Sequence, residues 1–475
     1  MATATPLVRQ RLTTQDAAFL YSETANGPMH GGGLAVFEGD IPFEKLVAHI
    51  RGRLHLIPRY RQRLAFVPMN LNHATWEDDP NFRLENHVFA HTIPAGSSLN
   101  DAIAEAIRVN EPMLERTKPL WETHVFSGVA DRTVLLTKVH HCMIDGVSGV
   151  ELSTVLMDFE ADAPAPQGED AWDPAPMPDP SVLIGQALVD SLQEQLETMQ
   201  RNQELMRNPQ LLADRSALIS RAAMTLTRVM GEPIVAAPWN ATQIGQERTF
   251  AWRRFPFSEI RALRASAGGT VNDVVLTVAT EAAARYLVEH GHPTDHQNFR
   301  LMCPVSVRRE GEGGALGNRV SGMFPTLPAW PMAVLDRHWA VITETTRIKE
   351  AGEAQGLELI TETAPPIPPA MMAPMLLSAL NPNPQPVFPP PARTPWFTPP
   401  QFGFNFVLTN VPGVQVTQYM AGHKCLDQFG PLMLGGTLGY GVVVGTYNQN
   451  LYFSLVADPR LLPDIEHMAD LFDTV

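Results

Sequence analysis

Two adjacent histidines, followed at short spacing by an aspartate and a glycine, form the strongest candidate for a catalytic site. The run reads His140-His141-Cys142-Met143-Ile144-Asp145-Gly146. A neutral imidazole at the mouth of a cleft titrates near physiological pH, which suits a general base. Such a base can take the proton of an alcohol while the alcohol oxygen attacks a carbonyl. Since a thioester is already an activated acyl donor, this chemistry needs no serine or cysteine nucleophile.

The apolar run 133–139 directly before the histidines has the length and composition of a strand. Because neighbouring side chains of an extended segment point to opposite sides, only one of the two histidines can face a given cavity. This disfavours joint metal binding by the pair and favours one catalytic and one packed histidine. Cys142 is expected to pack rather than to act as a nucleophile. Taken alone, a His-His pair is also compatible with ordinary packing or a surface position.

Two further motifs have both a structural and a functional interpretation. Asn272-Asp273 follows Gly268-Gly269-Thr270 and opens an apolar helix expected over 271–287. These residue types commonly cap helices, but Asn272 could also stabilise the oxyanion that develops during acyl transfer. Pro119-Leu120-Trp121 either packs in a core or shapes a substrate channel.

Five arginines crowd into a short stretch of an otherwise acidic chain: Arg51, Arg53, Arg59, Arg61 and Arg63. One interpretation is a solvated helix and turn. The alternative is a local basic face that binds the phosphates of CoA or an anionic membrane.

The bulk composition excludes several classes of function. The chain has 475 residues and a net charge of −15, with 35 basic and 50 acidic side chains, so no nucleic-acid role is expected. Its three cysteines lie far apart, which disfavours a disulfide framework or a zinc site and favours a reducing cytoplasm. No apolar run reaches about 18 residues, and the first residues do not resemble a secretory signal, so no membrane-spanning helix is expected.

The order of the expected elements predicts an α/β fold with two halves. The expected segments are an N-terminal half at 1–160, a linker and helical crossover at 161–247, and a C-terminal half at 248–475. Strands are expected at 33–37, 133–139, 299–307, 404–409, 439–447 and 451–456, and helices at 43–56, 99–114 (capped by Asn100), 181–230 and 271–287. The stretch 158–180 reads as an exposed extended linker, and the proline-rich stretch 363–400 as a loop or lid.

The sequence resembles the bacterial wax ester synthase/acyl-CoA:diacylglycerol acyltransferase family over most of its length. The segments that carry the resemblance, in chain order, are Leu12-Thr13-Thr14-Gln15-Asp16-Ala17-Ala18-Phe19, Pro28-Met29-His30, 58–64, Asp79-Pro80-Asn81-Phe82 with His87, Pro119-Leu120-Trp121, 140–146, Asn272-Asp273, Pro304-Val305-Ser306-Val307-Arg308, Gly317-Asn318 and Thr409-Asn410-Val411-Pro412-Gly413. The resemblance implies two chloramphenicol acetyltransferase-like halves, each a mixed sheet flanked by helices, with the active site at their interface.

The resemblance also implies an activity and a set of roles. A long-chain acyl group would pass from acyl-CoA to a fatty alcohol or diacylglycerol, without a cofactor or a metal. The implied catalytic residues are His141 as the base, with His140, Asp145, Gly146 and Asn272. The implied substrate-binding residues are Pro119, Leu120, Trp121, Asp273 and Asn410. Asp145 would also be structural, and Arg308 is its expected partner.

Two other functions stay open at this point. One is a condensation-type enzyme with a carrier-bound donor or an amine acceptor. The other is a non-catalytic lipid-binding relative. Lipid substrates imply peripheral contact with a membrane or a lipid droplet, through apolar loops or the arginine-rich stretch. The preferred acceptor, the acyl chain length and the oligomeric state do not follow from the sequence.

Overall fold

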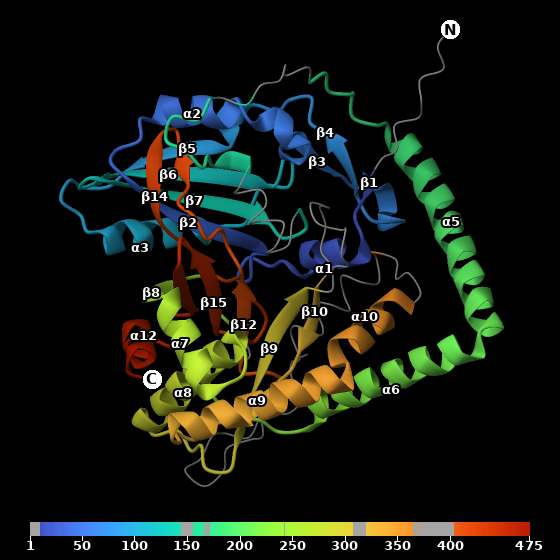
Figure 1. The fold of residues 1–475 in the computed structure, drawn as a ribbon. Coiled ribbons are helices and arrows are strands. Elements are labelled where there is room, and N and C mark those ends of the chain that lie inside the picture. The colour runs from blue at the N-terminus through green and yellow to red at the C-terminus, as the bar shows by residue number, and fades with distance from the viewer. Residues whose placement is uncertain are drawn as a thin grey trace.

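The computed structural model describes residues 10–143, 155–164, 166, 172–241, 243–306, 320–363, 369 and 403–475. Within these ranges the chain forms two large sheets, one above the other in Figure 1, each with its own buried apolar cluster. The expected α/β fold with two halves is confirmed. A small third sheet joins β1 (Gln10–Arg11), β4 (Thr75–Asp78) and β3 (Gln62–Ala65) at the edge of the N-terminal half.

The N-terminal sheet has the strand order β13-β14-β2-β7-β6-β5. Its strands are β2 (His30–Glu38), β5 (Val88–Thr92), β6 (Trp121–Val129), β7 (Arg132–His140), β13 (Tyr419–Met420) and β14 (His423–Phe429). The helical elements of this half are α1 (Thr14–Ser22), α2 (Phe43–Arg51), α3 (Leu99–Asn110) and the short 3-10 turns η1 (Leu54–Leu56), η2 (Pro58–Arg61), η3 (Pro68–Asn70) and η4 (Leu84–Asn86). All neighbouring strands are antiparallel except β5 and β6.

The C-terminal sheet has the order β10-β9-β12-β15-β16-β8, and β11 also pairs with β9. Its strands are β8 (Thr249–Pro256), β9 (Asn298–Ser306), β10 (Val320–Met323), β11 (Thr326–Pro328), β12 (Phe406–Val411), β15 (Tyr440–Tyr447) and β16 (Asn450–Ala457). Its helices are α7 (Phe257–Ala267), α8 (Val271–Glu289), α9 (Val334–Ala351), α10 (Glu353–Thr363) and α12 (Ile465–Thr474). Strands β9, β12 and β15 are parallel, so this sheet is mixed.

The strand β14 leaves the C-terminal half and completes the N-terminal sheet. It pairs antiparallel with β2, from Cys425 opposite Phe37 to Phe429 opposite Leu34. The aromatic ring of Phe429 stacks on Trp252 of β8 with the ring centroids 4.6 Å apart. The two sheets are therefore tied together by a strand that hydrogen-bonds within one and packs on the other.

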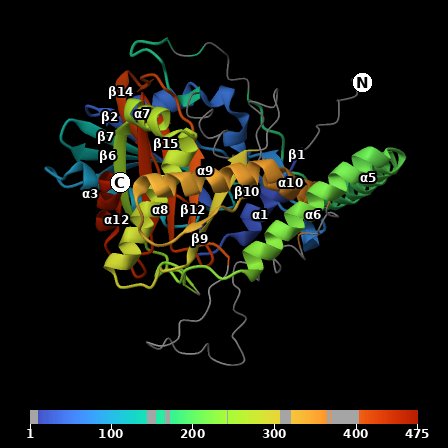
Figure 2. The same ribbon diagram turned by 60° about the horizontal axis from the view of Figure 1, so that its bottom comes forward.

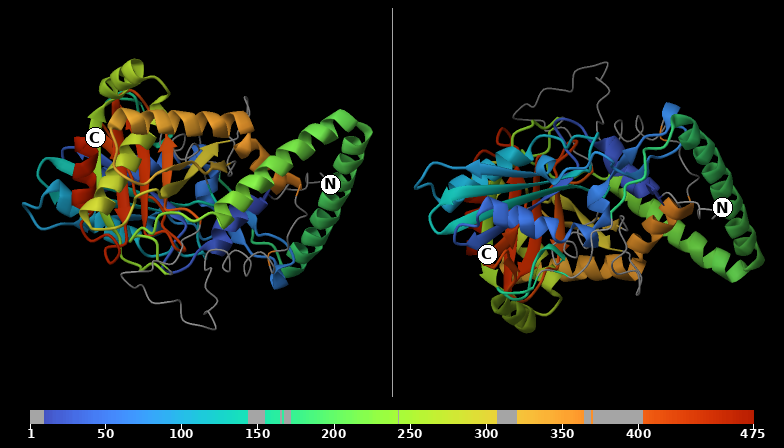
Figure 3. Two further views of the ribbon diagram at one scale, coloured as in Figure 1. Left: turned by 90° about the horizontal axis from the view of Figure 1, so that it is seen from below. Right: turned by 90° about the horizontal axis from the view of Figure 1, so that it is seen from above.

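Two long helices connect the halves, as the composition of 181–230 predicts. They are α5 (Pro180–Arg207) and α6 (Pro209–Gly231), separated by Asn208, whose side chain caps α6. Together they project from the two sheets in every view (Figures 1–3). No helix in the described part of the chain is long and apolar enough to cross a membrane.

The six strands expected from apolar runs are confirmed, with ends displaced by a few residues. The helix expected over 43–56 is too long, because α2 ends at Arg51 and a separate 3-10 turn follows. The cap assigned to Asn100 is wrong. Ser98 caps α3 in a reciprocal capping box with Asp101, which fixes the helix start earlier in the chain than the asparagine would.

Candidate active site

The paired histidines lie where β7 ends, and backbone hydrogen bonds hold both in place. His140 is the last residue of β7 and lies opposite His30 of β2. The N–H of His140 donates to the carbonyl of Leu120 at 3.0 Å, and that of His141 to the carbonyl of Met29 at 2.8 Å. The chain then turns, because the N–H of Met143 donates back to the His140 carbonyl at 2.9 Å. The pair thus straddles the end of a strand and the start of a turn.

His140 is completely buried and its ring has a fixed orientation. The backbone N–H of Cys142 donates to its Nδ1 at 3.1 Å, so the ring proton of the neutral imidazole is on Nε2. Nε2 faces Oε1 of Glu23 across 3.4 Å. This ring is therefore locked in one tautomer by the protein itself, which is a positioning arrangement rather than that of a group that exchanges protons with a substrate.

His141 is in a different environment from its neighbour. Its side chain is half-buried, and its ring stacks on Phe19 of α1, with the centroids 4.1 Å apart and the planes 23° from parallel. Figure 1 shows α1 on the side of the N-terminal sheet that faces the C-terminal half. His140 is therefore the packed histidine of the pair, and the reactivity of His141 stays a prediction.

The cysteine beside the histidines is a packing residue, as expected. Cys142 is buried in the N-terminal apolar cluster. Burial, reinforced by the negative charges of Asp16 and Glu23, raises the pKa of the Cys142 thiol well above its ordinary value. The thiolate that a nucleophilic mechanism requires is therefore not formed near neutral pH.

Glu23 is the site residue that the sequence did not reveal. Its side chain is fully buried, accepts a hydrogen bond from the backbone N–H of Met29 at 3.0 Å, and pairs with Arg116 at 2.8 Å. Burial alone raises the pKa of Glu23, but the contacts with His140, Arg116 and Met29 outweigh burial and lower it to about 2. The carboxylate therefore stays charged and supports both histidines, His140 directly and His141 through Met29.

The only sequence signal for Glu23 is its place between two family-like segments, residues 12–19 and 28–30. An acidic residue at the end of a short helix ordinarily reads as solvent-exposed. Its partner Arg116 is far along the chain, so the ion pair cannot be inferred without the fold.

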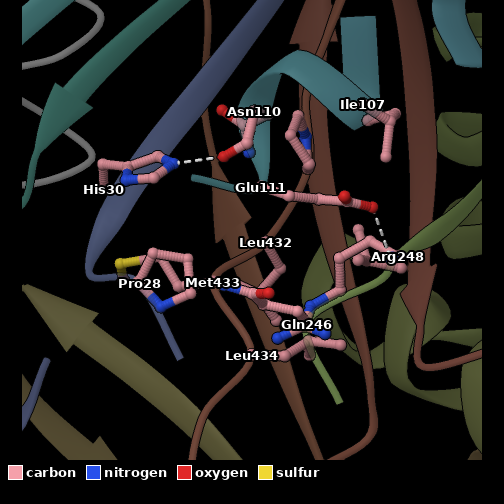
Figure 4. A pocket seen from close by; sticks show the side chains of 12 residues that line it. Pro28, His30, Ile107, Asn110, Glu111, Gln246, Arg248, Leu432, Met433 and Leu434 are labelled. Atoms are coloured by element: carbon pink, nitrogen blue, oxygen red, sulfur yellow. Dashed lines mark hydrogen bonds between the residues drawn. The ribbon is translucent and has the colours of Figure 1, made fainter. Parts of the chain in front are cut away.

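A small pocket lies between the two halves beside this network (Figure 4). His30 and Asn110 contribute one wall, where the His30 Nε2 is 2.6 Å from the Asn110 carbonyl. Across the pocket, the carboxylate of Glu111 accepts the backbone N–H of Arg248 at 2.8 Å. Its free space of about 20 Å³ accommodates a molecule of the size of water, not an acyl chain. Burial lowers the pKa of His30 to about 4, so this imidazole is neutral at physiological pH.

The structure separates the roles of Asn272 and Asp273. Asp273 is buried and forms a capping box with Thr270, and it also accepts a hydrogen bond from Thr345 at 2.8 Å. Asn272 is half-buried and its amide oxygen lies 3.5 Å from the side-chain nitrogen of Asn410 on β12. The capping function belongs to Asp273, whereas Asn272 and Asn410 form a pair of amides.

Pro119-Leu120-Trp121 belongs to the core of the N-terminal half. Trp121 is fully buried, donates its indole N–H to the carbonyl of Tyr60 at 2.8 Å, and stacks on the rings of Tyr60 and His87. Leu120 is also fully buried and its carbonyl accepts the N–H of His140. The motif therefore holds the end of β7 in place through the Leu120 carbonyl.

Both interpretations of the arginine-rich stretch are wrong for its central members. Arg53, Arg59 and Arg61 are only 3–4% exposed. Arg53 pairs with Asp158 at 2.5 Å, and this buried ion pair replaces the solvent expected around both residues.

The other two buried guanidinium groups lie over aromatic rings, Arg59 over Trp76 at 4.3 Å and Arg61 over Trp172 at 5.1 Å. Trp172 also contacts Phe82, so the stretch expected to be an exposed linker packs on the N-terminal half at this residue. Arg51 is exposed and pairs with Glu85.

Three predicted site residues, Asp145, Gly146 and Arg308, lie outside the described residues, as does most of the stretch 363–400. Among the residues that are described, no group of three or more His, Cys, Asp or Glu side chains could hold a metal ion.

Comparisons with known proteins match two parts of the chain. The family description "Wax ester synthase/diacylglycerol acyltransferase catalytic domain" matches residues 12–275, and "WS/DGAT C-terminal domain" matches residues 316–475. A probable diacylglycerol O-acyltransferase of Mycobacterium tuberculosis is 27% identical over 96% of this chain and 93% of its own. A second from the same species is 28% identical over 95% of both chains.

Solved structures show the same fold at low identity. The wax ester synthase/diacylglycerol acyltransferase from Marinobacter aquaeolei VT8 superposes with a TM-score of 0.62 at 20% identity, covering 98% of this chain and 97% of its own. The starter condensation domain of rhizomide synthetase, in complex with C8-CoA, superposes with a TM-score of 0.59 at 15% identity, covering 98% and 93%.

Proposed function

Because the chain belongs to the wax ester synthase/diacylglycerol acyltransferase family, we propose that His141 is the general base of an acyl-CoA-dependent O-acyltransferase. Its products would be wax esters or triacylglycerols. The observation that carries this assignment is the contrast within the histidine pair. One ring is buried and locked by the Cys142 N–H, and the other is half-buried at the end of the same strand.

The proposed reaction is a direct transfer in a ternary complex. Nε2 or Nδ1 of His141 takes the hydroxyl proton as the acceptor oxygen forms a bond to the thioester carbonyl carbon. The tetrahedral intermediate then collapses, the carbon–sulfur bond breaks, and the imidazolium returns the proton to the CoA thiolate. Atoms and charge balance without a covalent enzyme intermediate, and general base catalysis of this kind is worth about 10²–10⁴ in rate.

The amide pair of Asn272 and Asn410 is our candidate for the donors that stabilise the oxyanion. Asn272 lies in the first turn of α8, where backbone N–H groups and the helix dipole favour negative charge. Its side chain is free of the capping role, which Asp273 and Thr270 fill. In this assignment Asp273 caps the helix and Asn272 binds the oxyanion, so the two neighbouring residues have different roles.

Contact with a membrane or a lipid droplet is also proposed to be peripheral. The exposed apolar side chains around η3 are the candidate contact: Phe66, Met69 and Leu71. Because the central arginines of the 51–63 stretch are buried, we expect vesicle binding that hardly changes with salt. Replacing Met69 by Ser should weaken that binding. A strong loss of binding between 50 and about 300 mM salt would contradict the apolar mode.

The test of the catalytic assignment is His141→Ala, assayed with long-chain acyl-CoA and either a fatty alcohol or diacylglycerol. We expect kcat to fall about 10²–10⁴-fold, with unchanged thermal unfolding. His423→Ala, a partly exposed histidine on β14, is the matched control and should keep full activity. Near wild-type activity of His141→Ala would refute the assignment.

Two alternatives are decided by the same assay. A condensation-type enzyme would prefer an acyl-carrier protein donor or an amine acceptor, whereas we expect acyl-CoA and a hydroxyl. A non-catalytic lipid-binding protein would bind lipid without turnover under excess acyl-CoA. A matrix of acyl lengths against alcohol and diacylglycerol acceptors identifies the preferred substrates.

A further inference from the structure

The imidazole of His30 joins the first residue of β2 to the last residue of α3. His30 is 2% exposed, and its Nε2 lies 2.6 Å from the carbonyl oxygen of Asn110 (Figure 4). Because a carbonyl oxygen can only accept, the ring donates this hydrogen bond from Nε2–H. Burial lowers the pKa of His30 to about 4, so at physiological pH the ring is neutral and Nε2 carries its single proton.

The end of α3 is bound by a second side chain of the same sheet. An α-helix leaves its last carbonyl groups without an internal partner, and that of Asn110 is one of them. The buried Lys138 of β7 donates to two neighbouring carbonyls, of Val109 at 3.2 Å and of Pro112 at 3.0 Å. The helix dipole favours a cation at this end. The end of α3 is therefore held by one side chain from β2 and one from β7.

These two side chains lie beside the histidine pair. His30 is directly opposite His140 in the register of β2 and β7, and Lys138 is two residues before His140 on the same strand. Side chains two residues apart on a strand point to the same face, so all three share the face on which α3 ends. Directly opposite residues have Cβ atoms about 4.5–5.5 Å apart, so the position of His30 affects that of His140.

The residue before His30 connects it to His141. The carbonyl of Met29 accepts the N–H of His141 at 2.8 Å, and the N–H of Met29 donates to Glu23 at 3.0 Å. The peptide units around Met29 are thus fixed by Glu23 on one side and by the His30 ring on the other. A displacement of the start of β2 would move the Met29 carbonyl and with it the backbone of His141.

We propose that His30 is a positioning residue for His141, and that it acts by binding the start of β2 to the end of α3. The inference rests on the proposed acyl transfer with His141 as the base. In this role His30 acts through the Met29 backbone and takes no part in proton transfer. A histidine that served packing alone would tolerate an apolar or amide side chain of similar size, whereas this role requires a hydrogen-bond donor at the position of Nε2.

The first experiment compares His30→Gln with His30→Asn in the full chain, using palmitoyl-CoA and hexadecanol. The amide nitrogen of glutamine can take the place of Nε2 and donate to the Asn110 carbonyl, whereas that of asparagine is one methylene too short. We expect kcat of His30→Asn to fall about 10–100-fold with an unchanged KM, and kcat of His30→Gln to stay within about threefold of the wild type.

His49→Asn is the matched control for the loss of a buried ring. The side chain of His49 on α2 is 8% exposed, and its Nε2 lies 2.8 Å from the carbonyl of Leu156, so it forms the same kind of contact away from the histidine pair. This variant should lose thermal stability but keep the wild-type kcat. An equal loss of kcat in His49→Asn and His30→Asn would assign the effect to general destabilisation and overturn the inference.

The second experiment measures backbone hydrogen exchange by mass spectrometry and does not depend on activity. His30→Asn should lose protection of the His141 N–H, which donates to Met29, whereas His30→Gln should keep it. If His141→Ala retained activity, the proposed function would fail, and the exchange measurement would still decide whether His30 holds this backbone.

Three further results would overturn the inference. One is a wild-type kcat in His30→Asn. Another is a kcat of His30→Gln as low as that of His30→Asn, which would show that the Nε2–H donor is not what matters. The third is a higher KM without a lower kcat, which would place His30 in substrate binding instead.

Discussion

Replacing Glu23 by Gln removes one buried negative charge and keeps the shape of the side chain. In the wild type this carboxylate contacts Arg116, the Met29 N–H and His140. These contacts lower its pKa from 4.5 to about 2. A displacement of that size corresponds to about 3 kcal/mol of stabilisation of the folded state, at 1.36 kcal/mol for each pH unit.

The direction of the Glu23 pKa shift determines how its contribution to stability depends on pH. Because the folded pKa is lower than the unfolded one, the stabilisation is fully present above pH 4.5 and is lost as the pH falls towards 2. The difference between wild type and Glu23→Gln should therefore be about 3 kcal/mol at pH 7 and about 2 kcal/mol at pH 3.5. The variant should also lose about tenfold in kcat, since Met29 anchors the backbone of His141.

Urea unfolding followed by circular dichroism measures the stability difference at both pH values. Glu85→Gln is the matched control, because Glu85 also pairs with an arginine but is exposed, and its loss should cost less than about 1 kcal/mol. A difference for Glu23→Gln that is below 1 kcal/mol, or that does not change with pH, would refute the proposed role of the charge.

Four other substitutions test separate parts of the structure. Asn272→Ala should lower kcat about 10²–10³-fold with little change in KM, whereas Asp273→Asn should chiefly lower the melting temperature, since it weakens a helix cap by about 1 kcal/mol. Cys142→Ala should keep kcat within about twofold, and a large loss would restore a role for the thiol. Arg53→Gln should cost about 3–5 kcal/mol of unfolding free energy because it removes the buried guanidinium that pairs with the largely buried Asp158. Equal costs for Arg53→Gln and the exposed Arg51→Gln would contradict the observed burial.

Much of the fold could be predicted because it depends on local pattern. Apolar runs of strand length placed β2, β7 and β16, and helical composition placed α5, α6 and α8. The same pattern predicts that the histidine pair lies at the end of a strand. The split between His140 and His141 followed from the alternation of side chains along that strand.

The remainder depends on partners that are distant in the sequence. Arg53 and Arg61 read as solvated because their partners, Asp158 and Trp172, lie about a hundred residues further along the chain. Glu23 is tied to Arg116 in the same way. A charged residue is buried only when the fold brings a partner next to it. The local sequence around the charged residue does not show whether such a partner exists.

The pairing of β2 with β14 also constrains how the chain is made. Leu34 leaves the ribosome long before its partner Phe429, which lies far further along the chain. At ordinary translation rates of about 5–20 residues per second, the edge of β2 that pairs with β14 stays unpaired for tens of seconds. An unpaired edge strand invites aggregation during that delay. Truncating the gene before β13 should therefore yield an insoluble N-terminal fragment, and expression of the complete protein should benefit from chaperones or slow growth at low temperature.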